Sequence, residues 1–160
     1  MTDSAKSPAK NGELEMDELD RKILHAYLFD ARLSYRELAL RLGVSTTTVQ
    51  AHTVKLEKAG IIRGYSAIID HEKVGYQLTV ITEVSVAKGK LLELEREVAK
   101  IPQVLAVYDV TGLTDAIVIA KFKNREELSK FTKTLLAMPF TERTNTHIVL
   151  TTVKEDLRLL

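Results

Sequence analysis

Apolar positions in the first third of the chain recur at the three- and four-residue spacing of one helix face. Three such stretches follow one another between Asp17 and Gly60. The residues that precede them, Asp17, Ser34 and Ser45, are types that cap a helix N-terminus. Gly43, a type favoured just after a helix, ends the second stretch shortly before Ser45. The pattern therefore predicts three helices, the last two joined by the tight turn of a helix-turn-helix.

The segment after the third helix has a different pattern. Residues 61–70 read IIRGYSAIID, which is β-branched and alternating, so we expect a strand there, as in the winged form of the motif. Without that strand, the three helices also fit the corner of a plain helical bundle, because such turns are common outside DNA-binding proteins.

From Val74 onward, strand-like stretches alternate with helix-like ones. We expect strands in YQLTVITEVSV, VLAVYDVTG, DAIVIAKF and TNTHIVLTTVK, a first helix ended by Pro102 and a second one opened by Asn124. Their order, β-α-β-β-α-β, is the split unit of the ferredoxin-like sandwich. The predicted fold class is therefore α+β, with an N-terminal winged helix-turn-helix joined to a C-terminal ferredoxin-like βαββαβ sandwich.

The third of these strands is apolar on both faces. Helices cover one face of a ferredoxin-like sheet, so an apolar second face needs another cover. A second copy of the same sheet would provide it, and we therefore expect a homodimer formed through the sandwich. The two apolar sets of this strand are Ala116, Val118, Ala120 and Phe122 on one side, and Ile117 and Ile119 on the other.

Composition narrows the classes of function. The 160 residues carry a net charge of +1, which gives little support to a protein that binds nucleic acid by charge alone. The chain has no cysteine, so disulfides and thiolate metal sites are excluded, and a cytoplasmic location is expected. No apolar stretch is long enough for a membrane span, and residues 1–14 have the polar composition of a mobile tail rather than of a signal peptide.

The sequence gives no indication of a catalytic or metal site. Its four histidines lack the spacing of a chelating pair, and no nucleophile motif, catalytic pair of carboxylates or glycine-rich phosphate loop occurs. We therefore expect no metal, no cofactor and no enzymatic activity. The histidines are His25, His52, His71 and His147.

The third helix has one face that a DNA groove could contact. Winding the helix at about 100° per residue places five residues opposite the apolar Val49. That face is small, partly apolar and only mildly basic, which suits hydroxyl contacts to phosphate and methyl contacts to thymine. Free backbone N–H groups near Ser45, Thr46 and Thr47 can also bind a phosphate, although Ser45 is equally an ordinary N-cap. The five residues are Thr47, Ala51, Val54, Lys55 and Lys58.

Several of these stretches together resemble the Lrp/AsnC, or "feast/famine", family of transcription regulators. The resemblance is carried by DELDRKIL, ARLSYRELALRLGVS, VKLEKAGIIRGYSAIID, the loop VTG with Asp115, and TNTHIVLTTVK, in the family's order. It implies a winged helix-turn-helix over residues 15–62, a linker strand over 63–73 and, over 74–160, a RAM domain that binds an effector and forms oligomers. It also implies double-stranded DNA as a partner, dimers that assemble into tetramers or octamers, and an amino-acid effector held between dimers.

The resemblance also implies roles for single residues, at the two helix N-termini and in one loop with its adjoining strand. Taken with the face of the third helix, the candidate DNA contacts are Ser34, Tyr35, Arg36, Ser45, Thr46, Thr47, Gln50, Ala51, Val54, Lys55 and Lys58. The candidate effector contacts are Gly112, Thr114, Asp115, Thr144 and Thr146. Each effector contact also has an ordinary role open to it, in a hairpin turn, a turn cap or a strand.

Two departures from the family pattern bear on these roles. His52 and Thr53 stand where many relatives have an arginine and a branched apolar residue, which weakens the expected hold on phosphate in mid-helix. Leu113 and Thr114 stand where the effector loop usually carries an aspartate and an aromatic residue, which leaves the effector's identity open.

We interpret the chain as a sequence-specific DNA-binding transcription regulator that responds to an amino acid or a related small molecule. Two alternatives stay open. The family has relatives that decarboxylate a siroheme-type tetrapyrrole and no longer use the helix-turn-helix. A nucleoid-architectural protein, which wraps DNA with little sequence preference, would share the same fold and would bind scrambled DNA as tightly as its own upstream region.

Overall fold

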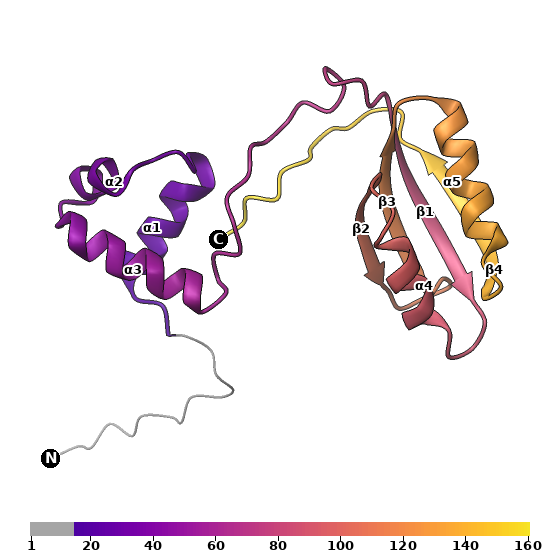
Figure 1. Cartoon of the computed structure of the whole chain (residues 1–160), viewed down its shortest axis with the longest axis horizontal. Coiled ribbons are helices and arrows are strands. Elements are labelled where there is room, and N and C mark those ends of the chain that lie inside the picture. The colour runs from indigo at the N-terminus through magenta and orange to yellow at the C-terminus, as the bar shows by residue number, and fades with distance from the viewer. Residues whose placement is uncertain (1–14) are drawn as a thin grey trace, which may run out of the picture. The chain divides into compact units, whose positions relative to one another are not determined.

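The structure, a computed structural model, describes residues 15–160, and the predicted mobile tail over residues 1–14 lies outside them. The chain divides into two compact units (Figure 1). One unit contains residues 15–68 together with Asp156–Leu160, and the other is Ile69–Glu155. All the helices of the first third of the chain belong to the former, and the sheet belongs to the latter.

The helical unit consists of α1 (Glu18–Phe29), α2 (Tyr35–Leu42) and α3 (Thr46–Lys58). The capping residues predicted from the sequence are confirmed: Asp17, Ser34 and Ser45 each accept a hydrogen bond from a backbone N–H in the first turn of their helix. In α1 and α2 a capping box completes the N-terminus, because the side chains of Asp20 and Glu37 bond back to the backbone N–H of the cap.

Buried side chains of all three helices meet in one core. Ile23, Leu38, Val49 and Leu56 are fully buried, and removing such side chains from water contributes about 25 cal/mol for each Å² of apolar surface. Gly43 ends α2 with a φ of 68°, a left-handed conformation that lets the chain turn at once into α3. The predicted helix-turn-helix is therefore present, with its core on the face that the sequence pattern indicated.

The strand predicted over residues 61–70, and with it the linker strand over 63–73, is wrong. The described chain forms no strand there, because all four paired strands come from residues 78–148 and none of them pairs with this segment. Its side chains Ile68 and Ile69 are 81% and 53% exposed. The segment is attached through Tyr65, whose hydroxyl donates to the Glu57 carboxylate at 3.0 Å, and burial together with this carboxylate raises the pKa of Tyr65. A β-branched alternating sequence needs a neighbouring strand before it can form a ladder.

The second unit is a four-stranded antiparallel sheet with two helices, in the predicted β-α-β-β-α-β order. Across the sheet the strands lie in the order second, third, first and fourth, so the first and third strands are central, as in a ferredoxin-like sandwich. The last strand starts at Thr141 and ends at Ile148, earlier than TNTHIVLTTVK predicts. The elements are β1 (Leu78–Val86), α4 (Leu91–Val98), β2 (Val104–Asp109), β3 (Ala116–Phe122), α5 (Arg125–Ala137) and β4 (Thr141–Ile148).

Helices cover one face of this sheet and leave the other face partly exposed. Val84 and Val118 pack with Leu94 of α4 and Leu135 of α5 into the core of the unit. On the opposite face Ile81 is 36% exposed, and Ile117 and Ile119 of β3 are partly exposed. That face therefore keeps partly exposed apolar side chains that no helix of the unit covers. Among the described residues, no helix combines the length and the apolar character needed to cross a membrane.

Candidate nucleic-acid interface

The N-termini of α2 and α3 both begin at serine caps but differ in charge. In α2, the Ser34 Oγ accepts from the Glu37 N–H at 3.3 Å, and the Glu37 carboxylate accepts from the Ser34 N–H at 2.8 Å. In α3, the Ser45 Oγ accepts from the Thr48 N–H at 3.0 Å, and no acidic residue lies in the first turn. The positive end of the α3 dipole and its free N–H groups are therefore left without a neighbouring carboxylate on their own helix, which favours an external anion.

Most of the candidate DNA contacts along α3, which we call its reading face, are turned to solvent; they are Thr46, Thr47, Gln50, Ala51, Val54, Lys55 and Lys58. Thr46, Thr47, Gln50, Ala51 and Lys58 are exposed, and Val54 is half-buried. Its surface offers hydroxyl, amide and methyl groups with one exposed ammonium, which are groups that contact phosphate oxygens and thymine methyls. On α2, which packs against α3, Ser34 and Arg36 are exposed and Tyr35 is half-buried.

Lys55, the remaining member of the predicted face, has a partner inside the protein. Its Nζ lies 2.6 Å from Oδ2 of Asp20, a side chain of α1 with no solvent exposure. The other oxygen of Asp20, Oδ1, lies 2.7 Å from Nδ1 of His52. Burial disfavours the charged form of Asp20, but hydrogen bonds from Lys55, His52 and the backbone N–H of Asp17 outweigh it and lower the pKa of this carboxyl. In return, the bond to Asp20 raises the pKa of Lys55.

Sequence reasoning missed this cluster. Asp20 occupies the third position of a capping box, which is a complete local explanation for an aspartate in a first turn. Its contacts to His52 and Lys55 span 32 and 35 residues, a separation that helix periodicity does not address.

The same cluster brings together three groups able to bind a metal ion. One ligand atom each from Asp17, Asp20 and His52 lies within 4.8 Å of the others, although the histidine spacing in the sequence indicated no metal site. The Lys55 ammonium already provides a cation to Asp20, and a dication would be held beside it at the cost of like-charge repulsion. We therefore assign no metal to these residues.

The predicted effector loop is held against β1 by its own side chains. The Thr114 hydroxyl donates to the Val84 carbonyl at 2.8 Å, and the Asp115 Oδ2 accepts from the Val86 N–H at 2.8 Å. Gly112 is exposed with a φ of 134°, a conformation that L side chains rarely adopt. These residues therefore have the ordinary structural roles that the sequence left open, in a turn and in capping it. The second carboxylate oxygen of Asp115 can still accept a hydrogen bond from a ligand.

The predicted effector residues of β4 lie across β1 from this loop. Thr144 is paired with Val84 and Thr146 with Thr82, and the hydroxyls of Thr146 and Thr82 are 3.1 Å apart. Because Thr114 also bonds to Val84, the structure gathers both sets of candidates around one end of β1. The spacing in the sequence, about thirty residues, did not by itself place them together.

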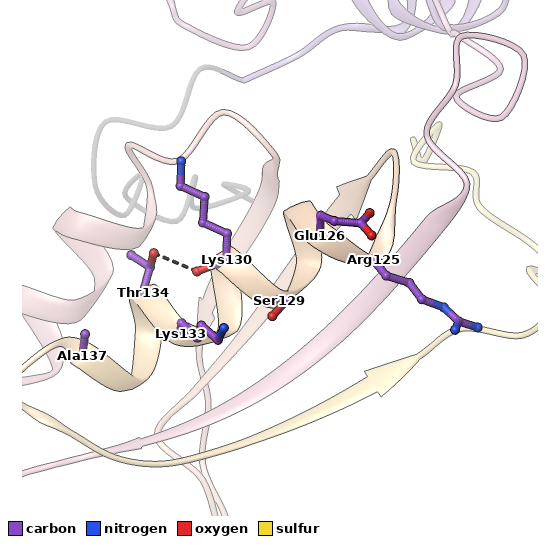
Figure 2. A pocket seen from close by; sticks show the side chains of 7 residues that line it. All are labelled: Arg125, Glu126, Ser129, Lys130, Lys133, Thr134 and Ala137. Atoms are coloured by element: carbon purple, nitrogen blue, oxygen red, sulfur yellow. Dashed lines mark hydrogen bonds between the residues drawn. The ribbon is translucent and has the colours of Figure 1, made fainter.

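A shallow depression on the outer surface of α5 is formed by side chains of that single helix (Figure 2). The side chains of Arg125 and Lys130 point away from one another, and the Thr134 hydroxyl donates to the Lys130 carbonyl at 2.9 Å. Divergent charged groups do not converge on a ligand, so we assign no function to this surface. The lining residues are Arg125, Glu126, Ser129, Lys130, Lys133, Thr134 and Ala137.

Comparison with protein families gives matches in both units. Residues 16–63 match a family described as winged helix-turn-helix DNA-binding, and residues 79–159 match the Lrp/AsnC ligand binding domain. An uncharacterised HTH-type transcriptional regulator of Pyrococcus abyssi is 47% identical over 90% of this chain and 98% of its own length. The HTH-type transcriptional regulator FL11 of Pyrococcus horikoshii is 36% identical over 90% of this chain and 95% of its own.

Solved structures share the same fold. A transcriptional regulator of Neisseria meningitidis in complex with L-Met superposes with a TM-score of 0.85 at 31% identity, covering 91% of this chain and 96% of that one. AsnC of E. coli superposes with a TM-score of 0.82 at 24% identity, covering 89% of this chain and 97% of that one, a likeness of fold alone.

Proposed function

The chain belongs to the Lrp/AsnC family of transcription regulators, and we propose that it reads operator DNA through α3 under the control of an amino acid or a related small molecule. The observation that carries the proposal is the N-terminus of α3, which has exposed hydroxyl groups and free N–H groups but no acidic residue in its first turn. Such an end binds a phosphate through its dipole and its backbone donors, without a cluster of basic side chains.

The proposed DNA contacts divide into two kinds. Backbone N–H groups and hydroxyls at the N-termini of α2 and α3 hold phosphates and set the orientation of the protein. The side chains along α3 then meet base edges, where methyl groups and an amide can read thymine and adenine. The phosphate-contacting residues are Ser34, Tyr35, Arg36, Ser45, Thr46, Thr47 and Lys58, and the base-reading residues are Gln50, Ala51 and Val54.

A homodimer would allow α3 to recognise DNA although it carries few basic side chains. Two copies joined through the uncovered sheet face of the sandwich would each present one α3, and helices about 34 Å apart enter successive major grooves. Each copy then supplies half of the contacts. Assembly of dimers into tetramers or octamers would multiply modest contacts further through avidity. The apolar side chains left on that face, such as Ile81, support the dimer.

The proposed effector site lies at the end of β1. On one side of β1, Thr114 bonds to Val84 and Asp115 to Val86, in the loop that also contains Gly112, and on the other side Thr144 and Thr146 pair with Val84 and Thr82. A carboxylate and several hydroxyls are the groups that bind the ammonium and carboxylate of an amino acid. The complex of the Neisseria meningitidis regulator with L-Met supports an amino acid as the ligand class.

Fluorescence anisotropy tests the proposed function. Purified protein is titrated onto labelled duplex from upstream of its own gene and onto a scrambled duplex of equal length, over a salt series, with and without each amino acid. We expect preference for the upstream duplex and a change in affinity with at least one amino acid. Equal affinity for both duplexes at every salt concentration would contradict sequence-specific regulation and favour a nucleoid-architectural protein.

A further inference from the structure

We propose that Asp20 is a specificity-determining residue that acts through Lys55, by neutralising this lysine beside the reading face of α3. Asp20 lies in α1 and does not itself reach DNA, so it is a positioning residue. The inference rests on the DNA-contact face proposed above. It assigns Lys55, which the sequence pattern places on that face, to an internal ion pair rather than to a phosphate.

The geometry keeps Asp20 in place. Its side chain has no solvent exposure, and its two oxygens are used by His52 and Lys55, with the Asp17 N–H bonding to Oδ2 as well. A capping box fixes the first turn of α1 around it, since Asp20 N–H also donates to Asp17 at 2.8 Å. The carboxylate therefore cannot move out to solvent without breaking the N-terminus of α1.

The same geometry restrains Lys55. Its side chain is 36% exposed, but its ammonium lies 2.6 Å from a carboxylate that has no access to water. If Lys55 moved to a phosphate, the buried carboxylate would lose its lysine partner and keep only its bonds to His52 and the Asp17 N–H, and removing one partner of a buried ion pair is unfavourable. The bond therefore holds Lys55 toward the protein when DNA is present.

This pairing explains the low charge of the recognition helix. α3 carries Lys55, Glu57 and Lys58, and the pairing with Asp20 cancels the first of them. Lys58 remains as an exposed cation of the reading face. Sequence-independent affinity for DNA rises with the number of phosphates that a protein neutralises, whereas hydroxyl and methyl contacts depend on the base sequence. Cancelling Lys55 therefore lowers binding to unrelated DNA and raises the ratio of specific to non-specific affinity.

The test compares four proteins on the upstream and scrambled duplexes, at one pH, over a salt series: wild type, Asp20→Asn, the neutral pair Asp20→Asn/Lys55→Gln, and the control Glu18→Gln. The control removes a carboxylate from the same turn of α1, where Glu18 pairs with Lys22 at 2.7 Å on an exposed surface. Thermal unfolding of each protein is recorded first, so that affinities refer to folded protein.

We expect Asp20→Asn to release Lys55. Its slope of log K against log salt on scrambled DNA should steepen by about 0.9, the value for one additional phosphate contact on B-DNA, and its preference for the upstream duplex should fall. The neutral pair and the Glu18→Gln control should keep the wild-type slope. A purely structural role for Asp20 would lower thermal stability and leave the slopes unchanged, which would overturn the proposal.

The neutral pair decides the question even if Asp20→Asn alone does not fold. Replacing both charges leaves the local net charge as it was, so a slope shallower than wild type by about 0.9 would mean that Lys55 contacts phosphate, and the proposal would be wrong. Failure of the proposed function looks different, since wild type itself would then show no preference for its upstream DNA. A wild type that binds neither duplex would overturn both.

Discussion

Helices α2 and α3 pack against each other in one helix-turn-helix, and each begins at an exposed serine. Their first turns differ in charge, because only α2 has an acidic residue there. In α2, the Glu37 carboxylate lies at the positive end of the helix dipole and accepts hydrogen bonds from the Ser34 N–H and hydroxyl. α3 has threonines where α2 has its carboxylate, and its first turn contains no acidic residue. A helix optimised for the fold supplies its own anion, whereas a helix that binds an external anion leaves that position neutral.

The largest expected effect comes from placing a charge at the open end of α3. Thr47→Asp puts a carboxylate beside the phosphate site, and juxtaposed like charges cost several kcal/mol, so operator affinity should fall by about 100-fold or more. Anisotropy measures the loss, and light scattering should show an unchanged oligomer. Thr134→Asp, the same substitution on the exposed surface of α5, is the matched control and should leave affinity within about twofold of wild type. Retained binding by Thr47→Asp would mean that another face contacts DNA.

The two serine caps should also differ in their contribution to thermal stability. Ser34→Ala and Ser45→Ala each lose an N-cap, which costs about 1 kcal/mol and lowers the Tm by several degrees. We expect Ser34→Ala to be the more destabilising of the two, because the Ser34 hydroxyl donates to the Glu37 carboxylate at 2.7 Å, whereas the Ser45 hydroxyl lies 2.8 Å from the neutral hydroxyl of Thr48. Scanning calorimetry of both variants beside wild type provides the values. A larger loss for Ser45→Ala would contradict the view that α2 is the more fully capped helix.

The smallest effect is a difference in pH dependence. Hydrogen bonds from the Ser34 side chain and backbone lower the pKa of Glu37 in the folded protein. A carboxyl with a depressed pKa contributes stability that is complete above its unfolded pKa, about 4.3, and is lost as the pH falls through its folded value. Glu37→Gln should therefore lose less stability than wild type between about pH 5 and pH 3. Parallel acid-unfolding curves for the two proteins would show that the α2 capping box contributes nothing in solution.

Local features of the fold could be predicted from the sequence. Asp17, Ser34, Ser45 and Gly43 act within three or four residues of themselves, so their roles follow from local rules of helix capping. The β-α-β-β-α-β order followed in the same way, because each element has its own periodicity. Residues 61–70 show the limit of this reasoning, since a strand-like pattern forms a strand only where a neighbour pairs with it.

Candidate site residues were harder to assign for the same reason. The surface positions of α3, such as Thr47 and Ala51, follow from winding one helix. The partner of Lys55 does not, because Asp20 lies 35 residues away on another helix. Likewise Thr114 and Asp115 are visible as loop residues, but their bonds to β1 cross about thirty residues. Tertiary pairing, which no period in the sequence records, decides which of the predicted side chains remain free for a ligand.

The substitution Thr48→Glu tests whether the open N-terminus of α3 binds DNA phosphate. Thr48 occupies in α3 the position of Glu37 in α2, so the substitution gives α3 the same capping box. The measurement is operator affinity by anisotropy, with Tm recorded on the same sample. We expect a Tm equal to or above that of wild type and an operator affinity at least about tenfold weaker, because the new carboxylate replaces the phosphate. Unchanged affinity with an unchanged Tm would contradict phosphate binding at this N-terminus.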